Sequence, residues 1–402
     1  MTDVTTPDSG DACDWQPSAR RAPIDPMTWT FAQVPWRGEQ PPTLADLTTL
    51  GVGGPVARYI EADTEAAFIE AILEADRAGR PLLVIGGGSN LIPSDAGFPG
   101  VVVRDLRRDV TVTEDTACGG ATVTVSAGMP LDALVARGIE EGWMGLETLS
   151  GIPGTVGAAP VQNVGAYGHE ISEVVSSVTT LDRETGQRRQ FSLSELGFGY
   201  RTSVLKESLE KWGPSPRWIV LDVEFAFRHA TLSAPVAYAQ LARTLGCKVG
   251  DRVDALAVRE AVLDLRRGKG MVLDAADPDT HSAGSFFTNP IVSAADADTL
   301  PPDAPRYPVL DHSARRNIAD AAPEVPGLVK TSAAWLIDHA GFTKGFALTA
   351  DAPVALSTKH ALAITRRSPD ATAADISRLR QRIVEGVRDT YGVTLRPEPV
   401  TL

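Results

Sequence analysis

Apolar residues recur along the chain at two spacings, one typical of helices and one typical of strands. Phe68, Ile72 and Ala75 follow a capping residue at Asp63 at helical spacing, and Gly79 ends this predicted helix. A short apolar run at residues 82–85 then predicts a buried strand. Four further strands are predicted at residues 101–103, 122–126, 174–181 and 219–227.

Two amphipathic helices are predicted in the second half of the chain. One carries an apolar stripe over residues 255–265 and ends in Arg266, Arg267, Gly268 and Lys269, where the helix dipole favours cations. The other starts at a capping-box-like sequence, residues 372–375, and ends at Gly392. The basic end of the first helix either holds an anionic ligand or is simply solvated.

Two segments lack any periodicity. Residues 1–29 are rich in Thr, Asp, Pro and Ser and predict a disordered lead-in, in which Met27 could be the physiological start. Residues 291–327 are rich in Ala, Asp and Pro and predict a linker or flexible loop.

Length and charge restrict the possible classes of protein. A chain of 402 residues is expected to form two or three domains. With 38 basic and 51 acidic residues the net charge is −13, which argues against a general binder of nucleic acid or of an anionic membrane surface. No signal peptide and no membrane span is evident, so we expect a soluble protein.

The cysteines and histidines give no sign of a disulfide framework or a metal site. Cys13, Cys118 and Cys247 are widely separated, which favours a reducing cytoplasm. The six histidines show no spacing typical of metal ligands, so no metal is predicted. His281 deserves notice only because it precedes a distinctive serine-containing sequence.

Glycine-rich segments predict a cradle for a large ligand. Residues 151–168 contain five glycines and no charged side chain, and the strand at 82–85 runs directly into Gly86-Gly87-Gly88-Ser89-Asn90. Repeated glycines let backbone N–H groups approach a pyrophosphate closely. The spacing matches neither the Rossmann nor the Walker pattern. A glycine-rich structural turn is the alternative.

The most distinctive sequence is Ser282-Ala-Gly-Ser285-Phe286-Phe287-Thr-Asn289-Pro290. Small residues before Ser285 would leave its hydroxyl accessible, while the two phenylalanines could exclude water. Such a serine could donate a proton. A nucleophilic role is disfavoured because the G-x-S-x-G elbow is absent, and ordinary core packing is the alternative.

Eight motifs in order resemble the UDP-N-acetylenolpyruvoylglucosamine reductase family over roughly residues 43–400. Besides the segments above they include residues 49–55, 145–147, 199–201 and 395–398. The resemblance implies an α+β fold, with a two-part FAD-binding module of the vanillyl-alcohol oxidase type and a C-terminal α/β substrate domain. We therefore expect FAD-binding subdomain 1 at 30–105 with 393–402, subdomain 2 at 106–270, and a substrate-binding domain at 271–392.

The resemblance also implies chemistry and residues. The family reduces UDP-N-acetylglucosamine enolpyruvate to UDP-N-acetylmuramate for peptidoglycan synthesis, using FAD and NADPH. By this resemblance Ser285 protonates the substrate, Arg201 and Glu398 stabilise the enolate, and Tyr238, Lys269 and Asn289 contact the UDP-sugar. The residues expected to bind FAD are Gly86, Gly87, Gly88, Ser89, Asn90, Ile152, Gly154, Thr155, Gly157, Gln162, Asn163, Gly165, Ala166, Tyr167 and Arg266.

The chain departs from the family pattern in places, and two other functions stay open. Residues common in the family are replaced here by Thr288, Ala239-Gln240 and Thr365. These replacements could alter contacts with the substrate without changing the catalytic residues.

The alternative functions are an FAD-dependent oxidase of the vanillyl-alcohol type and a non-catalytic flavin or UDP-sugar binding module. We expect a monomer with a small-molecule substrate.

Overall fold

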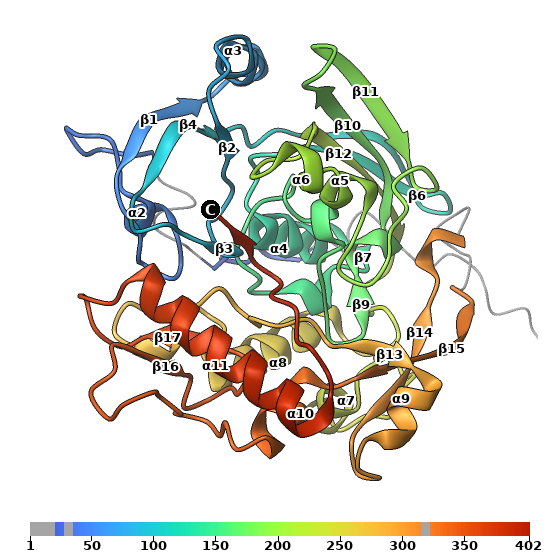
Figure 1. The fold of residues 1–402 in the computed structure, drawn as a ribbon. Coiled ribbons are helices and arrows are strands. Elements are labelled where there is room, and N and C mark those ends of the chain that lie inside the picture. Colours follow the sequence, from blue (N-terminus) through green and yellow to red (C-terminus); the bar gives the residue numbers. More distant parts are fainter. Residues whose placement is uncertain (1–20, 28–34, 315–321) are drawn as a thin grey trace, which may run out of the picture.

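The computed structural model describes residues 21–27, 35–314 and 322–402. Three groups of elements are visible in Figure 1: a small parallel sheet at the upper left, a larger antiparallel sheet at the upper right, and a layer of helices and short strands below both. Helices and strands are mixed throughout, as the α+β prediction requires.

The small sheet has the order β1-β4-β2, with all neighbours parallel. Helix α3 packs on it through Phe68, Ala71, Ile72 and Ala75. Its first turn is capped by the Thr64 side chain, so the cap lies one residue after the predicted Asp63. The elements here are α2 (Leu44–Leu47), β1 (Val56–Ala62), α3 (Glu65–Arg77), β2 (Leu82–Val84), β3 (Leu91–Ile92) and β4 (Phe98–Asp105).

The larger sheet has the antiparallel order β11-β10-β12-β6-β5, and β7 pairs with one end of β12. Val223, Phe225 and Phe227 of β12 point into the core beneath α4, as the alternation from Ile219 predicted. Its elements are β5 (Val110–Thr116), β6 (Gly120–Ser126), α4 (Leu131–Glu141), β7 (Trp143–Met144), β10 (Val175–Asp182), β11 (Gln187–Ser192) and β12 (Trp218–His229).

Short elements connect the strands of this sheet. They are the 3-10 helices η2 (Glu147–Leu149), η3 (Pro160–Gln162) and η4 (Ile171–Glu173), the hairpin of β8 (Gly165–Ala166) and β9 (His169–Glu170), and helices α5 (Val204–Glu207) and α6 (Leu209–Trp212).

The lower layer is built on helices α8 and α11, which have the apolar stripes and end points expected. Helix α11 begins at a Thr372–Asp375 capping box and ends at Gly392, whose φ of 69° is left-handed. Its elements are α7 (Ala239–Leu245), α8 (Ala255–Gly268), η5 (Pro278–Thr280), β13 (Ile291–Ser293), α9 (Ala294–Thr299), β14 (Arg306–Leu310), η6 (His312–Ala314), β15 (Glu324–Thr331), α10 (Ala333–His339), β16 (Val354–Leu356), β17 (Ile364–Arg366) and α11 (Ala373–Tyr391).

The C-terminal end of the chain returns to the upper part. After α11 it runs upward between the two upper sheets (Figure 1), and β18 (Val400–Thr401) pairs in parallel with β3. Residues 91–92 and 400–401, which are far apart in the sequence, are thereby brought together.

Two predictions about irregular segments are wrong within the described residues. Residues 291–327 contain β13, helix α9, β14 and the first half of β15, and these strands form a sheet in the order β13-β15-β14. The composition does not reveal that Ala297, Leu300 and Ala304 are buried there. Residues 21–27 are bound to the body of the protein, since the Ile24 and Met27 amides donate to Glu140 and Asp132. The rest of the predicted 1–29 lead-in lies outside the described residues.

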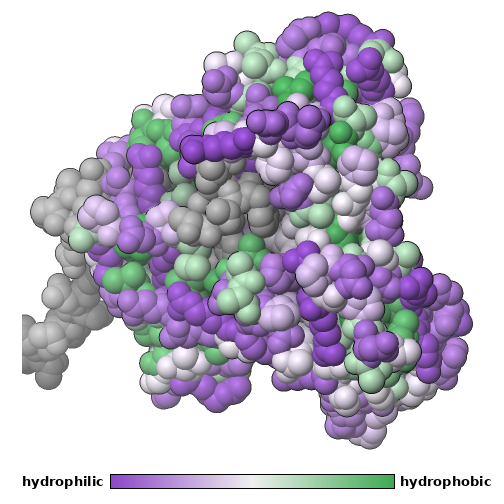
Figure 2. Space-filling view, turned by 90° about the vertical axis from the view of Figure 1, so that its left-hand side faces the viewer, coloured by the Kyte–Doolittle hydropathy of each residue, from purple (hydrophilic) through white to green (hydrophobic). Residues whose placement is uncertain are grey.

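The face of the molecule shown in Figure 2 is mainly hydrophilic. On the face shown in Figure 2, hydrophobic residues form small separate groups rather than one continuous patch. Within the described ranges, no helix is long and apolar enough to cross a bilayer.

Candidate active site

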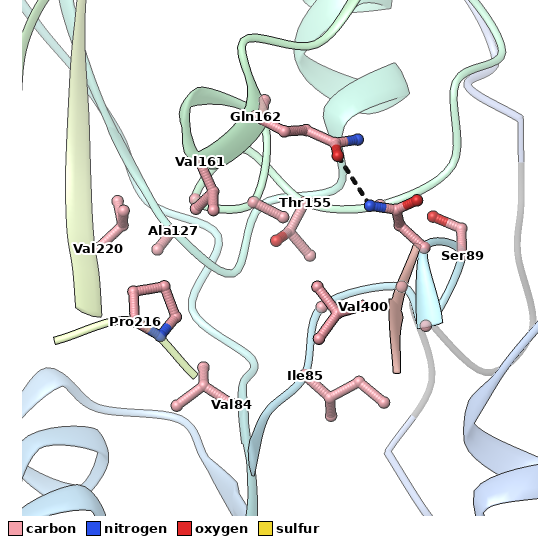
Figure 3. Close-up of a pocket in the computed structure, with 18 of the residues that line it drawn as sticks. Val84, Ile85, Ser89, Ala127, Thr155, Val161, Gln162, Pro216, Val220 and Val400 are labelled. Atoms are coloured by element: carbon pink, nitrogen blue, oxygen red, sulfur yellow. Dashed lines mark hydrogen bonds between the residues drawn. The ribbon is translucent and has the colours of Figure 1, made fainter. Parts of the chain in front are cut away.

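An apolar cavity lies between the two upper sheets, where both glycine-rich segments meet. Ile85, Ala127, Val161 and Val220 supply apolar side chains to it (Figure 3). Val400 of the C-terminal strand closes another side. Ten of the predicted FAD contacts line the cavity: Gly86, Gly87, Gly88, Ser89, Asn90, Ile152, Gly154, Thr155, Gly157 and Gln162.

Two of these glycines are required by close packing. A Cβ at Gly88, where φ is +59°, would lie 1.8 Å from the carbonyl oxygen of Leu47. A Cβ at Gly86 would lie 2.9 Å from Oγ1 of Thr155, on the opposite wall of the cavity. The glycines therefore let two backbone segments approach each other and leave a narrow slot between them.

Polar side chains join the two glycine-rich segments. Nδ2 of Asn90 donates to Oε1 of Gln162 at 2.8 Å (Figure 3), and Oγ of Ser89 donates to the carbonyl of Pro153 at 3.3 Å. A slot with apolar walls and amide groups at one end suits a flat aromatic ligand with a polar tail.

The remaining predicted FAD contacts, Asn163, Gly165, Ala166, Tyr167 and Arg266, do not line this cavity. Asn163 is fully buried and its amide contacts Glu170 and the carbonyl of Gly199. Arg266 is buried too, and its Nε has no hydrogen-bond partner among the described residues. Burial lowers the pKa of Arg266.

The predicted catalytic pair is brought together. Nε of Arg201 lies 3.4 Å from Oε1 of Glu398, and both side chains are largely buried. Arg201 has a positive φ of 56° and donates through its other nitrogens to the carbonyls of Asn163 (3.1 Å) and Gly165 (2.6 Å). The glycine-rich segment thus orients the arginine, a role that sequence analysis did not predict for it.

A lysine that sequence analysis missed completes this cluster. Lys206 of α5 lines the cavity and donates from Nζ to the carbonyl of Arg201 at 3.1 Å. Burial raises the pKa of Glu398, against the opposing effect of Arg201 and Lys206. Burial lowers the pKa of Lys206. A single lysine in a short helix gives no sequence signal, because only the tertiary fold buries it.

The segment around Ser285 lies against the same cluster. The Glu398 amide donates to the carbonyl of Phe286 at 2.9 Å, and the Asn289 amide donates to the Tyr200 hydroxyl at 3.2 Å. Phe286 and Phe287 are buried, as expected, while Ser285 is only partly buried. The serine is therefore adjacent in the chain to residues fixed on the Arg201–Glu398 cluster.

Lys330 of β15 is a second residue that sequence analysis missed. Its Nζ lies 4.5 Å from the ring centroid of Tyr200, and burial lowers its pKa. It places another cation beside Asn289, whose Oδ1 accepts from the Ala333 amide.

The predicted diphosphate contacts lie at a second, more open cavity and its edge. Lys269 lines this cavity with Lys344, Lys359, His360 and Trp335. Burial, together with Lys269 and Lys344, lowers the pKa of His360 to about 4. Tyr238 immediately precedes α7, is 44 % exposed, and its ring meets Tyr167 edge-on at 5.7 Å. Of the cations at the end of α8, Arg267 is exposed and pairs with Asp264 instead.

No group of three or more His, Cys, Asp or Glu side chains within the described residues could hold a metal ion. His281 lines neither cavity.

Comparison with known proteins decides the family. The sequence model of the FAD binding domain matches residues 55–192, and that of the UDP-N-acetylenolpyruvoylglucosamine reductase C-terminal domain matches residues 277–402. The UDP-N-acetylenolpyruvoylglucosamine reductase of Cutibacterium acnes is 48 % identical over 90 % of this chain and 89 % of its own length. The chain belongs to the UDP-N-acetylenolpyruvoylglucosamine reductase family.

Other members of this reductase family also match this chain over most of its length and of their own. The Thermobifida fusca reductase is 48 % identical over 94 % of this chain and 99 % of its own length. The crystal structure of the Thermus caldophilus reductase matches with a TM-score of 0.56 at 26 % identity, covering 89 % of this chain and 97 % of that one. The expected combination of an FAD-binding module and a C-terminal reductase domain is confirmed.

Proposed function

We propose that this chain reduces UDP-N-acetylglucosamine enolpyruvate to UDP-N-acetylmuramate, with FAD as resident cofactor and NADPH as reductant. The observation that carries the proposal is the largely buried Arg201–Glu398 pair. The backbone of Glu398 is hydrogen-bonded to Phe286, the residue after Ser285, and Lys206 links Arg201 to the glycine-lined slot. The alternatives, an oxidase and a non-catalytic binding module, have no need of a proton donor and an anion-stabilising pair at the same place.

The residues of the slot fit FAD. A Cβ at Gly86 would crowd Thr155, which also lines the slot, and the apolar walls suit a flat ring system. Bound there, FAD would take electrons from NADPH and pass them to the substrate as a hydride. Gly86 to Asn90 and Ile152 to Gly157 would hold its pyrophosphate by backbone N–H groups.

Arg201, Glu398 and Ser285 would handle charge and proton at the substrate. Arg201 binds the carboxylate on which enolate charge develops, through a charge-assisted hydrogen bond. Glu398, whose pKa burial raises, shares that charge in its protonated form. Ser285 then donates its hydroxyl proton to the enolate carbon.

Tyr238, Lys269 and Asn289 would bind the UDP part of the substrate. The lysines of the second cavity supply the positive charge that a diphosphate needs, and the overall charge of −13 makes such a local cluster necessary. The sequence-based division into two FAD subdomains, 30–105 with 393–402 and 106–270, and a substrate domain at 271–392 is part of the proposal. It is supported by the pairing of β18 with β3.

We also propose that the enzyme works as a monomer in the cytoplasm. The three cysteines of the chain, Cys13, Cys118 and Cys247, are widely separated in the sequence and form no paired motif, which suits a reducing compartment.

The test is the visible flavin spectrum of the purified protein under anaerobic conditions. Addition of NADPH is expected to bleach the flavin, and addition of the enolpyruvyl sugar is expected to restore it. Bleaching that only air reverses would favour the oxidase, and a protein without flavin would contradict the assignment of the slot. A flavin that neither NADPH nor the sugar affects would favour the binding module.

A further inference from the structure

His169 lies between the glycine-rich segment and the loop 233–238, which carries Tyr238. It follows Gly168 directly and belongs to β9. Its Nδ1 lies 2.6 Å from Oε2 of Glu173, and its Nε2 lies 2.9 Å from the carbonyl oxygen of Pro235. Both ring nitrogens therefore face oxygen acceptors.

A neutral imidazole carries one N–H group, so it can donate to only one of these two oxygen atoms. The protonated imidazolium carries two N–H groups and can donate to both oxygen atoms. We propose that His169 is a positioning residue that holds the loop 233–238 against the glycine-rich segment when it is protonated and releases Pro235 when it is not.

The loop is in close contact with this side of the molecule at two further points. A Cβ at Gly168 would lie 2.7 Å from Cβ of Ala237, so the two backbones touch. The buried carboxyl of Glu147 in η2 accepts from the backbone of Ala234, next to Pro235. Loss of the Pro235 bond therefore loosens one of several adjacent contacts and does not unfold the loop.

The contacts of His169 with Glu173 and with the Pro235 carbonyl form what we call the latch. Two carboxyl groups act on the imidazole: that of Glu173, from η4, and that of Glu147, from η2. On the far side of the loop, Nε of Arg252 donates to the carbonyl of Ser233 at 2.9 Å. The two carboxyl groups favour the imidazolium, whereas burial opposes it.

The balance of these effects favours the charged form. Burial is the largest single effect and lowers the pKa of His169. The opposing effects together raise this pKa above its ordinary value: they are the hydrogen bond and charge of Glu173, the Pro235 carbonyl and the charge of Glu147. The latch is then closed below the ordinary histidine pKa and is lost as pH rises through the raised value. The loop is thus expected to change at a pH above the ordinary histidine pKa.

The consequence for the enzyme rests on the proposed function. If Tyr238 binds the substrate diphosphate, an open latch raises KM for the UDP-sugar and leaves flavin reduction by NADPH unaffected. Opening of the latch needs no substrate, so it can be measured separately from KM.

The first measurement is hydrogen exchange of the peptide containing residues 233–238 in the FAD-loaded protein, corrected for intrinsic exchange. Its opening constant is expected to rise about tenfold between about pH 6 and about pH 9, the effect of losing one charge-assisted hydrogen bond. The core peptide 219–227 of β12 is the internal control. NMR titration of ¹³C-labelled histidine is expected to place His169 above the ordinary value.

Two variants test the cause. His169→Gln is expected to leave the loop open at both pH values, while His169→Arg, which keeps two donors throughout, is expected to remove the pH dependence with the loop closed. Equal exchange in wild type at both pH values, or a His169 that titrates below its ordinary value, would overturn the proposal even if a variant failed to fold. If exchange follows pH but KM does not, the latch stands and the role of Tyr238 in the proposed function is wrong.

Discussion

Arg201 and Glu398 form a largely buried ion pair although they come from distant parts of the chain. Nε of the arginine lies 3.4 Å from Oε1 of the glutamate, and Lys206 reaches the Arg201 carbonyl from the other side. Three ionisable groups thus share one buried space, in which each charge affects the protonation of the others.

The protonation of Glu398 is expected to control the pH dependence of sugar reduction. Burial raises its pKa, so the protonated form is present below that raised value and is lost as pH rises through it. In Lys206→Met a cation that favours the carboxylate is gone, and the alkaline fall in kcat should move to higher pH. Lys206→Arg should leave it nearly in place. The pH profile of single-turnover reduction measures this, and an unshifted profile in Lys206→Met would refute the coupling.

Ser285→Ala is expected to separate the two half-reactions. Reduction of FAD by NADPH should stay near the wild-type rate, while reduction of the enolpyruvyl sugar should fall about 10²-fold or more, in the range of general-acid losses. Thr288→Val removes a neighbouring hydroxyl and is the matched control. Stopped-flow flavin absorbance follows both steps, and equal losses in both would exclude the serine as proton donor.

Tyr238→Phe is expected to weaken substrate binding without loss of flavin. The ring is 44 % exposed and meets the ring of Tyr167, which also lies 5.4 Å from Nζ of Lys269, so a ligand held by Lys269 would lie close to Tyr238. KM should rise about tenfold or more, the value of one hydrogen bond to a charged group. Tyr59→Phe, in β1, is the control. If bound FAD falls in Tyr238→Phe while KM stays the same, the tyrosine is a core residue instead.

Asp132 is expected to be a large single contributor to stability. Its buried carboxylate accepts from both terminal nitrogens of Arg259 at 2.8 Å, from the Gly151 amide and from the Met27 amide. Asp132→Ala leaves the arginine buried without its partner, which costs about 3–5 kcal/mol of unfolding free energy. Urea unfolding measures this. Glu70→Ala, which breaks the exposed pair with Arg77, should change stability by less than about 1 kcal/mol.

Some parts of the site are local in the sequence and could be predicted. The glycines of residues 86–88 line the slot with Gly154 and Gly157, as expected, because glycine is required where backbone packs closely. The alternation in β12 and the capping box of α11 likewise gave correct elements, because both depend on neighbouring residues alone.

Other parts depend on contacts between distant segments. The carbonyl groups of Asn163 and Gly165 accept from Arg201 and orient it, and neither residue lines the cavity. The spacing of residues along the chain does not reveal this arrangement. The strands within 291–327 form because they pair with each other, whereas their composition alone resembles a linker.

The sequence by itself thus determined the family and the cofactor cradle, since motifs in order and close-packing glycines are local properties. Through the resemblance it also predicted catalytic roles for Ser285, Arg201 and Glu398, and these stay predictions. Only the tertiary structure decided which groups are buried together. Lys206, Lys330 and the two acceptors around His169 acquire their significance from burial and from neighbours far along the chain, because a pKa and a hydrogen bond depend on distance in space.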